Sequence, residues 1–94
     1  MSIRLNAQER IVYADGAATH LTKHECGILS VLMAHPDCAV SSEQIYREAW
    51  DQEPYACRGT IYVHVHHLRT KVERDPDCPK HILKVWGRGY VYHP

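Results

Sequence analysis

The sequence lacks several features that would indicate other classes of protein. It has no apolar run long enough to span a membrane and no segment resembling a signal peptide. Its four cysteines include no C-x-x-C pair of the kind that binds metal or cycles between thiol and disulfide; they are Cys26, Cys38, Cys57 and Cys78. We therefore expect a cytoplasmic protein with reduced thiols, no metal and no membrane association.

The sequence also lacks the patterns of an enzyme. We find no nucleophile–base pairing and no glycine-rich phosphate loop, and the short stretch GRG at 87–89 is better explained as a turn. With 94 residues the chain has the size of one domain, and 45% hydrophobic residues are enough for a modest core. We predict a single domain over residues 1–94 that is not an enzyme and needs no cofactor.

Net charge is a third absence, but the total of zero hides an asymmetry. Residues 1–56 contain four Lys or Arg and eight Asp or Glu, which gives a net charge of −4. Residues 57–94 contain seven bases and three acids, which gives +4. An asymmetry of this kind between the two halves indicates an anionic partner for the basic half.

Turn and capping signals predict the elements of the first half. Short alternating or apolar runs predict a small antiparallel sheet within residues 1–21, with a hairpin turn at 15–16. Capping boxes predict helices over 22–35 and 41–50. Thr22 with Glu25 would form the first box, and Ser41 with Gln44 the second. Between the helices, residues 38–40 are expected to form a short strand.

The second half is predicted to contain one more helix and a hairpin. The third helix is expected over 58–74, with Thr60 as its N-cap, and apolar strands around a glycine-flanked turn predict a hairpin over 81–93. Two helices joined by a turn and followed by a β-hairpin define a winged helix-turn-helix, in which the helix before the wing enters the major groove of DNA. The predicted class is therefore α+β: an N-terminal sheet, three helices and a wing.

The third helix carries the candidate binding surface. At 100° per residue, Ile61, Val65, Leu68 and Val72 share one direction and predict the buried side. Residues on the remaining surface are predicted to face bases: Tyr62, Val63, His66, His67 and Thr70. Contacts to phosphates or through the wing are expected from Arg58, Thr60, His64, Arg69, Lys71, Lys84, Trp86 and Arg88.

These residue types suit a DNA duplex. Imidazole and hydroxyl groups can donate to or accept from base edges, and Val63 can touch a thymine methyl group. Cations along the flanks of the helix can meet phosphates and fix its register. Arg88 at the hairpin tip can enter a minor groove, whose negative potential attracts arginine. The pattern therefore favours double-stranded DNA as the partner.

Four stretches together resemble the C-terminal DNA-binding (effector) domain of OmpR/PhoB-type response regulators. They are LTKHE at 21–25, VSSEQIYREAW at 40–50, TIYVHVHHLRTKV at 60–72 and VWGRGYVY at 85–92, and the resemblance covers essentially the whole chain. It implies a bacterial transcriptional regulator, the output of a two-component phosphorelay, whose third helix reads the major groove and whose wing contacts the minor groove. The receiver domain of that family is not part of this chain.

The resemblance also implies partners beyond DNA. In the family, the loop after the second helix is associated with RNA polymerase, which assigns that contact to Asp51, Gln52 and Glu53. Two copies commonly bind head to tail on direct-repeat DNA. The chain departs from the family at several contact positions. Members often have an arginine pair where His66 and His67 stand, an aspartate at Tyr62 and the wing arginine at Trp86.

Two other interpretations remain open from the sequence. A winged helix can serve as a protein-interaction module, and the zero net charge favours this reading; weak dependence of binding on salt would identify it. A metal-responsive regulator is the second, because His64 and His67 are three residues apart and Cys57 is near in sequence.

Overall fold

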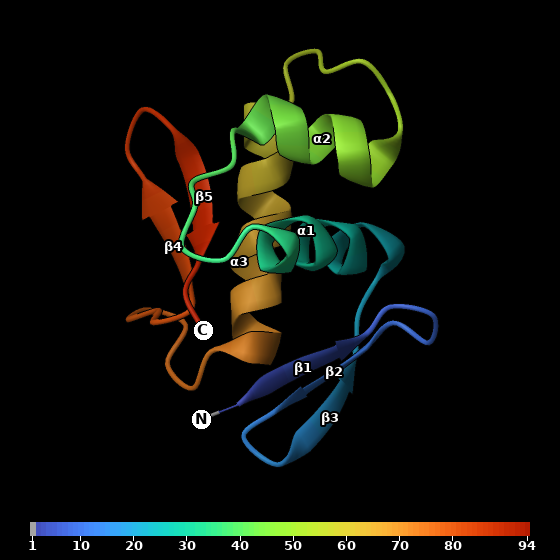
Figure 1. Ribbon diagram of the computed structural model, residues 1–94, viewed down its shortest axis with the longest axis vertical. Coiled ribbons are helices and arrows are strands. Elements are labelled where there is room, and N and C mark those ends of the chain that lie inside the picture. The colour runs from blue at the N-terminus through green and yellow to red at the C-terminus, as the bar shows by residue number, and fades with distance from the viewer. Residues whose placement is uncertain (1) are drawn as a thin grey trace.

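The structure is a computed structural model that describes residues 2–94, and Figure 1 shows the order and arrangement of its elements. Along the chain they are β1 (Ile3–Asn6), β2 (Ile11–Ala14), β3 (Ala17–His20), α1 (Lys23–Ala34), α2 (Ser42–Trp50), α3 (Arg58–Val72), β4 (Ile82–Val85) and β5 (Gly89–Tyr92). The predicted fold class, with an N-terminal antiparallel sheet, three helices and a C-terminal hairpin, is confirmed. Among the described residues, no helix is both long and apolar enough to cross a membrane.

The N-terminal sheet is built from two consecutive hairpins in the order β1-β2-β3. Ala14 pairs with Ala17 across the predicted turn, where Asp15 and Gly16 have φ of 53° and 78°. Two successive positive φ values are what a type I′ hairpin turn requires. The sheet packs through β2 against α3, and Val12 of β2 is completely buried.

Local capping chemistry starts the first two helices. The Thr22 hydroxyl accepts a hydrogen bond from the Glu25 amide at 3.2 Å, and the Glu25 carboxylate accepts one from the Thr22 amide at 2.9 Å, so the first predicted capping box is confirmed. At α2 the Ser41 hydroxyl accepts from the Gln44 amide at 3.1 Å. The Gln44 side chain, however, donates to Glu48 at 2.9 Å. The second box is therefore wrong in its returning half, because an i,i+4 carboxylate takes that amide group.

The start of α3 differs from the prediction. Its N-cap is Cys57 rather than Thr60, and no side chain caps it. Cys57 is 3% exposed, so the helix begins at a buried residue without a hydroxyl cap. Residues 38–40 form no strand; Val40 makes only an isolated bridge to Tyr90.

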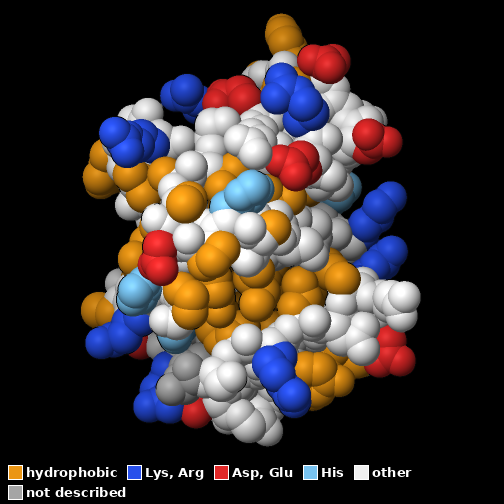
Figure 2. Space-filling view, viewed as in Figure 1, with side chains coloured by type: hydrophobic (Ala, Val, Ile, Leu, Met, Phe, Trp, Pro, Cys, Tyr) orange, Lys and Arg blue, Asp and Glu red, His pale blue; other side chains and the backbone are white. Residues whose placement is uncertain are grey.

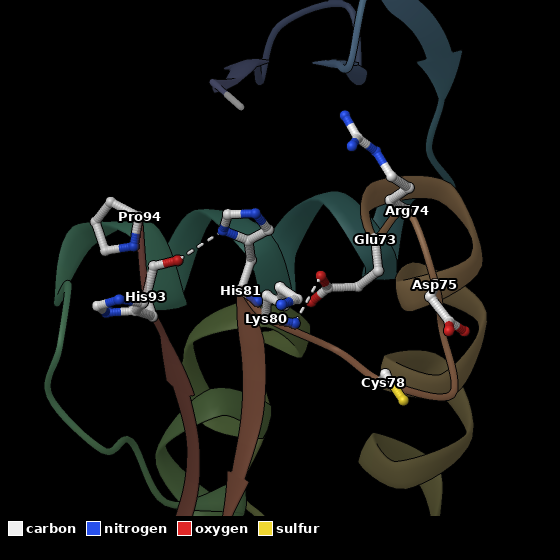
Figure 3. Close-up of a pocket in the computed structure, with 8 residues that line it drawn as sticks. All are labelled: Glu73, Arg74, Asp75, Cys78, Lys80, His81, His93 and Pro94. Atoms are coloured by element: carbon white, nitrogen blue, oxygen red, sulfur yellow. Dashed lines mark hydrogen bonds between the residues drawn. The ribbon is translucent and has the colours of Figure 1, made fainter.

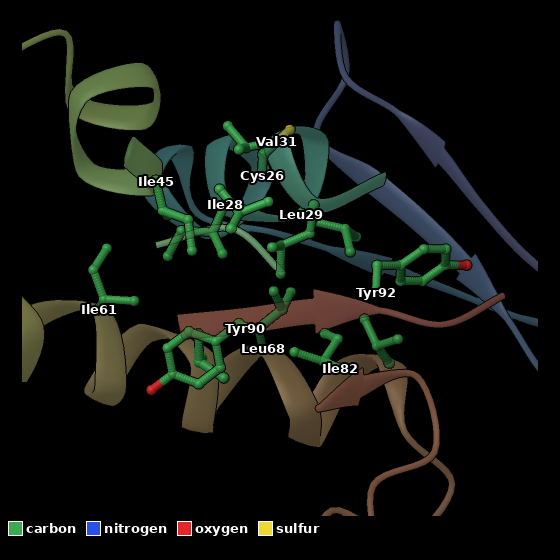
Figure 4. Packing of buried hydrophobic residues seen from close by; sticks show 14 of the residues in the cluster. Cys26, Ile28, Leu29, Val31, Ile45, Ile61, Leu68, Ile82, Tyr90 and Tyr92 are labelled. Carbon is green, nitrogen blue, oxygen red and sulfur yellow. The ribbon is translucent and has the colours of Figure 1, made fainter. Parts of the chain in front are cut away.

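The core lies between the helices and the wing (Figure 4). Its buried residues come mainly from β2, the three helices and both wing strands, and β1 packs against it through Ile3 and Leu5. The predicted stripe of α3 is confirmed, because its four aliphatic residues are 0–2% exposed. The largest completely buried side chains are Tyr90, Ile28, Leu29, Leu32, Ile45, Ile61, Leu68, Ile82, Val12, Val65 and Val72. At about 1.5–3 kcal/mol for each fully buried large apolar side chain, this cluster supplies the main driving force for folding.

Two glycines allow close approaches between elements. A Cβ on Gly27 of α1 would lie 2.9 Å from the Cβ of Ala49, so α1 and α2 pack closer here than two alanines permit. This contact explains a glycine inside a helix, where it costs about 1 kcal/mol relative to alanine. Gly89, with φ of +130°, brings the wing against the segment before α2, and a Cβ there would overlap the Val40 carbonyl oxygen.

Candidate nucleic-acid interface

The side of α3 opposite the core is open to solvent. Tyr62 and Val63 are 58% and 48% exposed, and His66, His67 and Thr70 are exposed as well. The imidazole rings of His66 and His67 lie side by side, with centroids 6.3 Å apart. The structure thus places all five predicted base-reading residues on the accessible surface of one helix.

One flank of α3 faces the wing. Arg69, partly buried, donates through Nε to the Ile82 carbonyl of β4 at 3.0 Å, which fixes the wing against the helix. Lys84 of β4 places Nζ 4.9 Å from the ring centroid of Tyr90 and 5.5 Å from that of Trp86. Burial raises the pKa of Tyr90, whose ring is therefore a neutral support for the Lys84 cation. Helix and wing form one continuous surface.

The other flank of α3 is tied to α1. Lys71 forms an ion pair with Glu25 at 2.7 Å, and the two side chains are only 28% and 4% exposed. Burial opposes ionisation of Glu25, but hydrogen bonds from Lys71 and Thr22 outweigh it and lower the pKa of this carboxyl group. The predicted phosphate contact of Lys71 is therefore better explained as a bridge between helices. Glu25 lies 46 positions away in the sequence, which is why the helical pattern alone did not reveal this role.

His64 is also turned inward from the predicted contact surface. Its ring meets Trp50 edge-on at 5.2 Å and His24 at 5.6 Å, while His24 stacks on Trp50 at 4.1 Å. The His64 Nδ1–H donates to the Thr60 carbonyl at 2.8 Å. This histidine–tryptophan cluster joins all three helices. Sequence reasoning missed it because its members are on three separate elements.

A polar pocket of about 130 Å³ lies where the wing meets the starts of α2 and α3. Its lining contains three cations and one acid: Ser41, Ser42, Glu43, Arg58, Lys84, Gly87, Arg88 and Gly89. Arg58 pairs with Glu43 at 3.2 Å, but its side chain remains 82% exposed. The first amides of α2 are unsatisfied within the helix and favour an anion. Sequence reasoning gave Ser41 a capping role and did not connect this helix start to the wing.

A larger pocket of about 530 Å³ lies at the other end of α3 and has a structural explanation (Figure 3). Glu73, 7% exposed, accepts backbone hydrogen bonds from Lys80, His81 and Ile82 at 2.7–3.0 Å. This carboxylate holds the loop between α3 and β4 in place. Sequence reasoning did not single it out, because nothing in the local pattern distinguishes it from a surface acid.

The loop between α2 and α3 arches above α2, away from the rest of the domain (Figure 1). Asp51, Gln52 and Glu53 are all exposed, and Asp51 ends the helix in the left-handed conformation with φ of 54°. Tyr55, in the same loop, is 90% exposed. The loop is therefore accessible to a partner.

Apolar and basic side chains gather on different parts of the surface. In Figure 2 apolar side chains lie together between α1 and the N-terminal sheet, whereas Lys and Arg lie mostly toward the edges of the view. In the same orientation α3 passes behind α1 (Figure 1). The face with the apolar side chains is thus not the one that presents the predicted base-reading residues.

The sequence and the fold both match known proteins. Residues 16–92 match the family described as "Transcriptional regulatory protein, C terminal". The chain belongs to this family, the DNA-binding domains of OmpR/PhoB-type response regulators. The resemblance on which the sequence analysis relied is confirmed.

Individual members of the family support the same assignment. The chain is 37% identical over 79 residues to the uncharacterized transcriptional regulatory protein YcbL of Bacillus subtilis, covering 84% of this chain and 35% of that protein. The DNA-binding domain of CpxR from E. coli has a TM-score of 0.81 at 26% identity, with 97% and 89% of the two chains covered. The response regulator DrrB of Thermotoga maritima, an OmpR/PhoB homolog, has a TM-score of 0.83 at 27% identity, with 98% and 42% covered. The chain spans about a third of the length of the curated relatives that it matches.

Proposed function

We propose that this domain binds double-stranded DNA in a sequence-specific manner, with α3 in the major groove and the β4–β5 wing on the adjacent minor groove. The observation that carries the proposal is the exposed face of α3 next to a cationic wing, in a chain of this family. Its 15 residues give α3 a length of about 22 Å, and a helix of this kind fits the major groove. In the whole protein the domain would be the transcriptional output of a two-component response regulator.

Two kinds of contact follow from the geometry. His66 and His67 present ring nitrogens to base edges, with Tyr62 and Val63 beside them. The Thr70 hydroxyl donates to the His67 carbonyl within the helix and would meet a base edge as an acceptor. Phosphates would meet the pocket beside the wing, where cations and the first amides of α2 converge; the residues are Arg58, Lys84 and Arg88, with Ser42 and Glu43 supplying the amides. Thr60, Arg69 and Trp86 border this surface. Lys71 and His64 contribute less, because their polar atoms are engaged within the domain.

The proposal extends to two further partners. We infer that two copies bind head to tail on direct-repeat DNA, and that Asp51, Gln52 and Glu53 contact RNA polymerase. The family resemblance and the exposure of the loop support these assignments. The metal-responsive alternative lacks support of this kind: Cys57 is buried, His64 is held by Thr60, and no three potential ligands converge within residues 2–94.

A selection from random duplexes tests the proposal. We expect enrichment of a defined site, and binding to it should weaken steeply as salt rises, because phosphate neutralisation releases counterions. Fluorescence anisotropy on the selected duplex at several salt concentrations measures this dependence. No enrichment, or affinity that hardly changes with salt, would instead favour the protein-interaction module.

Two variants distinguish residues that recognise bases from residues that position the domain on the DNA backbone. His67→Ala should change the selected sequence at one or two positions, because an imidazole on the outer face of α3 meets base edges. Arg88→Ala should weaken binding to all sequences alike and reduce the salt dependence, since a wing cation meets the backbone. The same selection, repeated with each variant, provides the measurement. Identical selected sites for His67→Ala and the unchanged domain would exclude a base-reading role for His67.

A further inference from the structure

The tip of the wing exposes a large apolar side chain. Trp86 is 86% exposed, whereas the other tryptophan, Trp50, is partly buried. The turn that carries it is closed by a hydrogen bond from the Arg88 amide to the Val85 carbonyl at 2.9 Å, and Gly87 supplies the positive φ of 76°. The indole therefore makes no contribution to the core and is available to a partner.

The hairpin that carries Trp86 is attached to the rest of the domain by several hydrogen bonds. Val40 and Tyr90 exchange two backbone hydrogen bonds of 2.7 and 3.0 Å, and Tyr90 is 1% exposed. Gly89 lies directly against the Val40 carbonyl. The hairpin is therefore fixed to the body of the domain on one side of its turn, and Arg69 fixes the other strand to α3. The strands on both sides of Trp86 are thus fixed to the domain, and β4 is fixed to α3 itself.

The surroundings of Trp86 indicate what it meets. Lys84 lies 5.5 Å from the ring centroid, and Lys84, Arg88 and Arg58 line one polar pocket next to the wing. Arg58 is already paired with Glu43. An apolar protein surface would match the indole but offer no anion to Lys84 and Arg88. A nucleic acid matches both, because its phosphates are anionic and its base pairs present stackable faces.

We propose that Trp86 is a wedge that inserts its indole at a base step of the minor groove beside the site of α3, partly unstacks that step and bends the duplex. Inserted apolar side chains kink DNA in this way, and pyrimidine–purine steps such as TA yield most easily. Trp86 would then select a flexible step at a position where the domain makes no base-edge hydrogen bond. This inference rests on the proposed DNA binding and adds the deformation and its sequence preference.

The experiment uses two duplexes that differ at one step. Both carry the selected site of α3; one has TA and the other AA at the step beneath the wing. The 94-residue domain and its variants Trp86→Ala and Trp86→Arg are compared by anisotropy for affinity and by energy transfer between dyes on the duplex ends for bending. Tyr55→Ala is the matched control, because Tyr55 is a similarly exposed aromatic residue on a different loop.

Insertion of Trp86 at a base step predicts a different result for each variant. Trp86→Ala should lose about tenfold in affinity for the TA duplex, as is typical when one aromatic–base contact is removed, and should bend it less. The loss should be smaller on the AA duplex. Trp86→Arg should recover affinity through the minor-groove potential but not the bend. Tyr55→Ala should match the unchanged domain in both measurements.

Three results would overturn the proposal. Equal affinity and equal bending by Trp86→Ala and the unchanged domain would remove the wedge while leaving the proposed DNA binding in place. Failure of the unchanged domain to bind any selected duplex would remove both. A blue shift of Trp86 fluorescence on vesicles of about one-third phosphatidylserine in phosphatidylcholine, with no change on the duplex, would assign the indole to a membrane surface. The fluorescence arm uses a Trp50→Phe background so that Trp86 alone reports.

Discussion

Glu73 illustrates how much of this domain depends on single residues that look ordinary in the sequence. Its carboxylate satisfies three successive backbone amides at the start of β4. Lys71 and Glu25 form a similar long-range pair between α3 and α1. In contrast, the four aliphatic residues on the buried side of α3 were predicted correctly, because a helical repeat of 3.6 residues can be recognised within one short segment of sequence. Partners that are distant in the chain leave no such pattern.

Glu73→Ala should therefore destabilise the domain. Removing the carboxylate leaves one buried and two partly buried backbone donors without acceptors, and we expect the free energy of unfolding to fall by about 2 kcal/mol. Urea denaturation followed by circular dichroism measures the change. Glu9→Ala is the control, because Glu9 is an exposed residue, and its effect should stay within about 0.5 kcal/mol. Equal effects of the two substitutions would contradict the role assigned to Glu73.

At the scale of elements, local sequence signals predicted where the first two helices start. They did not predict how the helices pack against one another. The Thr22 capping box and the Asp15–Gly16 turn are short-range chemistry, and both could be predicted from the sequence. The start of α3 could not, since no side chain caps it and its N-cap is the buried Cys57. The sequence showed that Gly27 weakens α1 as an isolated helix but gave no reason for it. The reason is the approach of α2 at Ala49.

Gly27→Ala tests this helix contact. Alanine favours the helix by about 1 kcal/mol, but overpacking typically costs about 1–3 kcal/mol, so we expect a net loss of stability. The double variant Gly27→Ala, Ala49→Gly transfers the missing methyl group from one helix to the other. Its loss should be smaller than the sum of the two single losses, as measured by urea denaturation. Strict additivity would show that the two residues do not meet.

The histidine–tryptophan cluster makes the assembly of the three helices sensitive to acid. Burial, the nearby His64 and Lys23 lower the pKa of His24 below its ordinary value of 6.5. The unfolded chain therefore takes up this proton more readily than the folded domain does. The stabilising effect of a neutral His24 is complete above pH 6.5 and decreases as the pH falls below that value.

His24→Phe should reduce this loss of stability on acidification, because the aromatic stack on Trp50 remains while the titrating group is removed. The measurement is the free energy of unfolding at several pH values between about 7.5 and 5.5, the range in which histidine titrates. His20→Phe is the control, since His20 is exposed on β3, outside the cluster. If His24→Phe keeps the full pH dependence of the unchanged domain, the cluster is not its source.

At the scale of the whole molecule, the opposite charges of the two halves also form ion pairs with each other. Each ion pair that an arginine or lysine forms within residues 2–94 joins a base of the second half to an acid of the first: Arg58 to Glu43, Lys71 to Glu25 and Arg74 to Asp15. The asymmetry that predicted an anionic partner is thus partly satisfied within the fold. Composition alone could not show this, because it does not reveal which charges meet.

The reading face of α3 has two exposed histidines, and we expect DNA affinity to depend on pH through them. Imidazole is the side-chain group that most often changes charge near neutral pH. The exposed rings of His66 and His67 lie where the proposed duplex would meet α3. Anisotropy on the selected duplex at constant salt should show tighter binding at about pH 6 than at about pH 7.5. The variant His66→Gln, His67→Gln keeps polar side chains but cannot gain charge, so its affinity should change much less. If both proteins gained affinity equally, the protons would act elsewhere, and the two histidines would serve only as hydrogen-bonding groups.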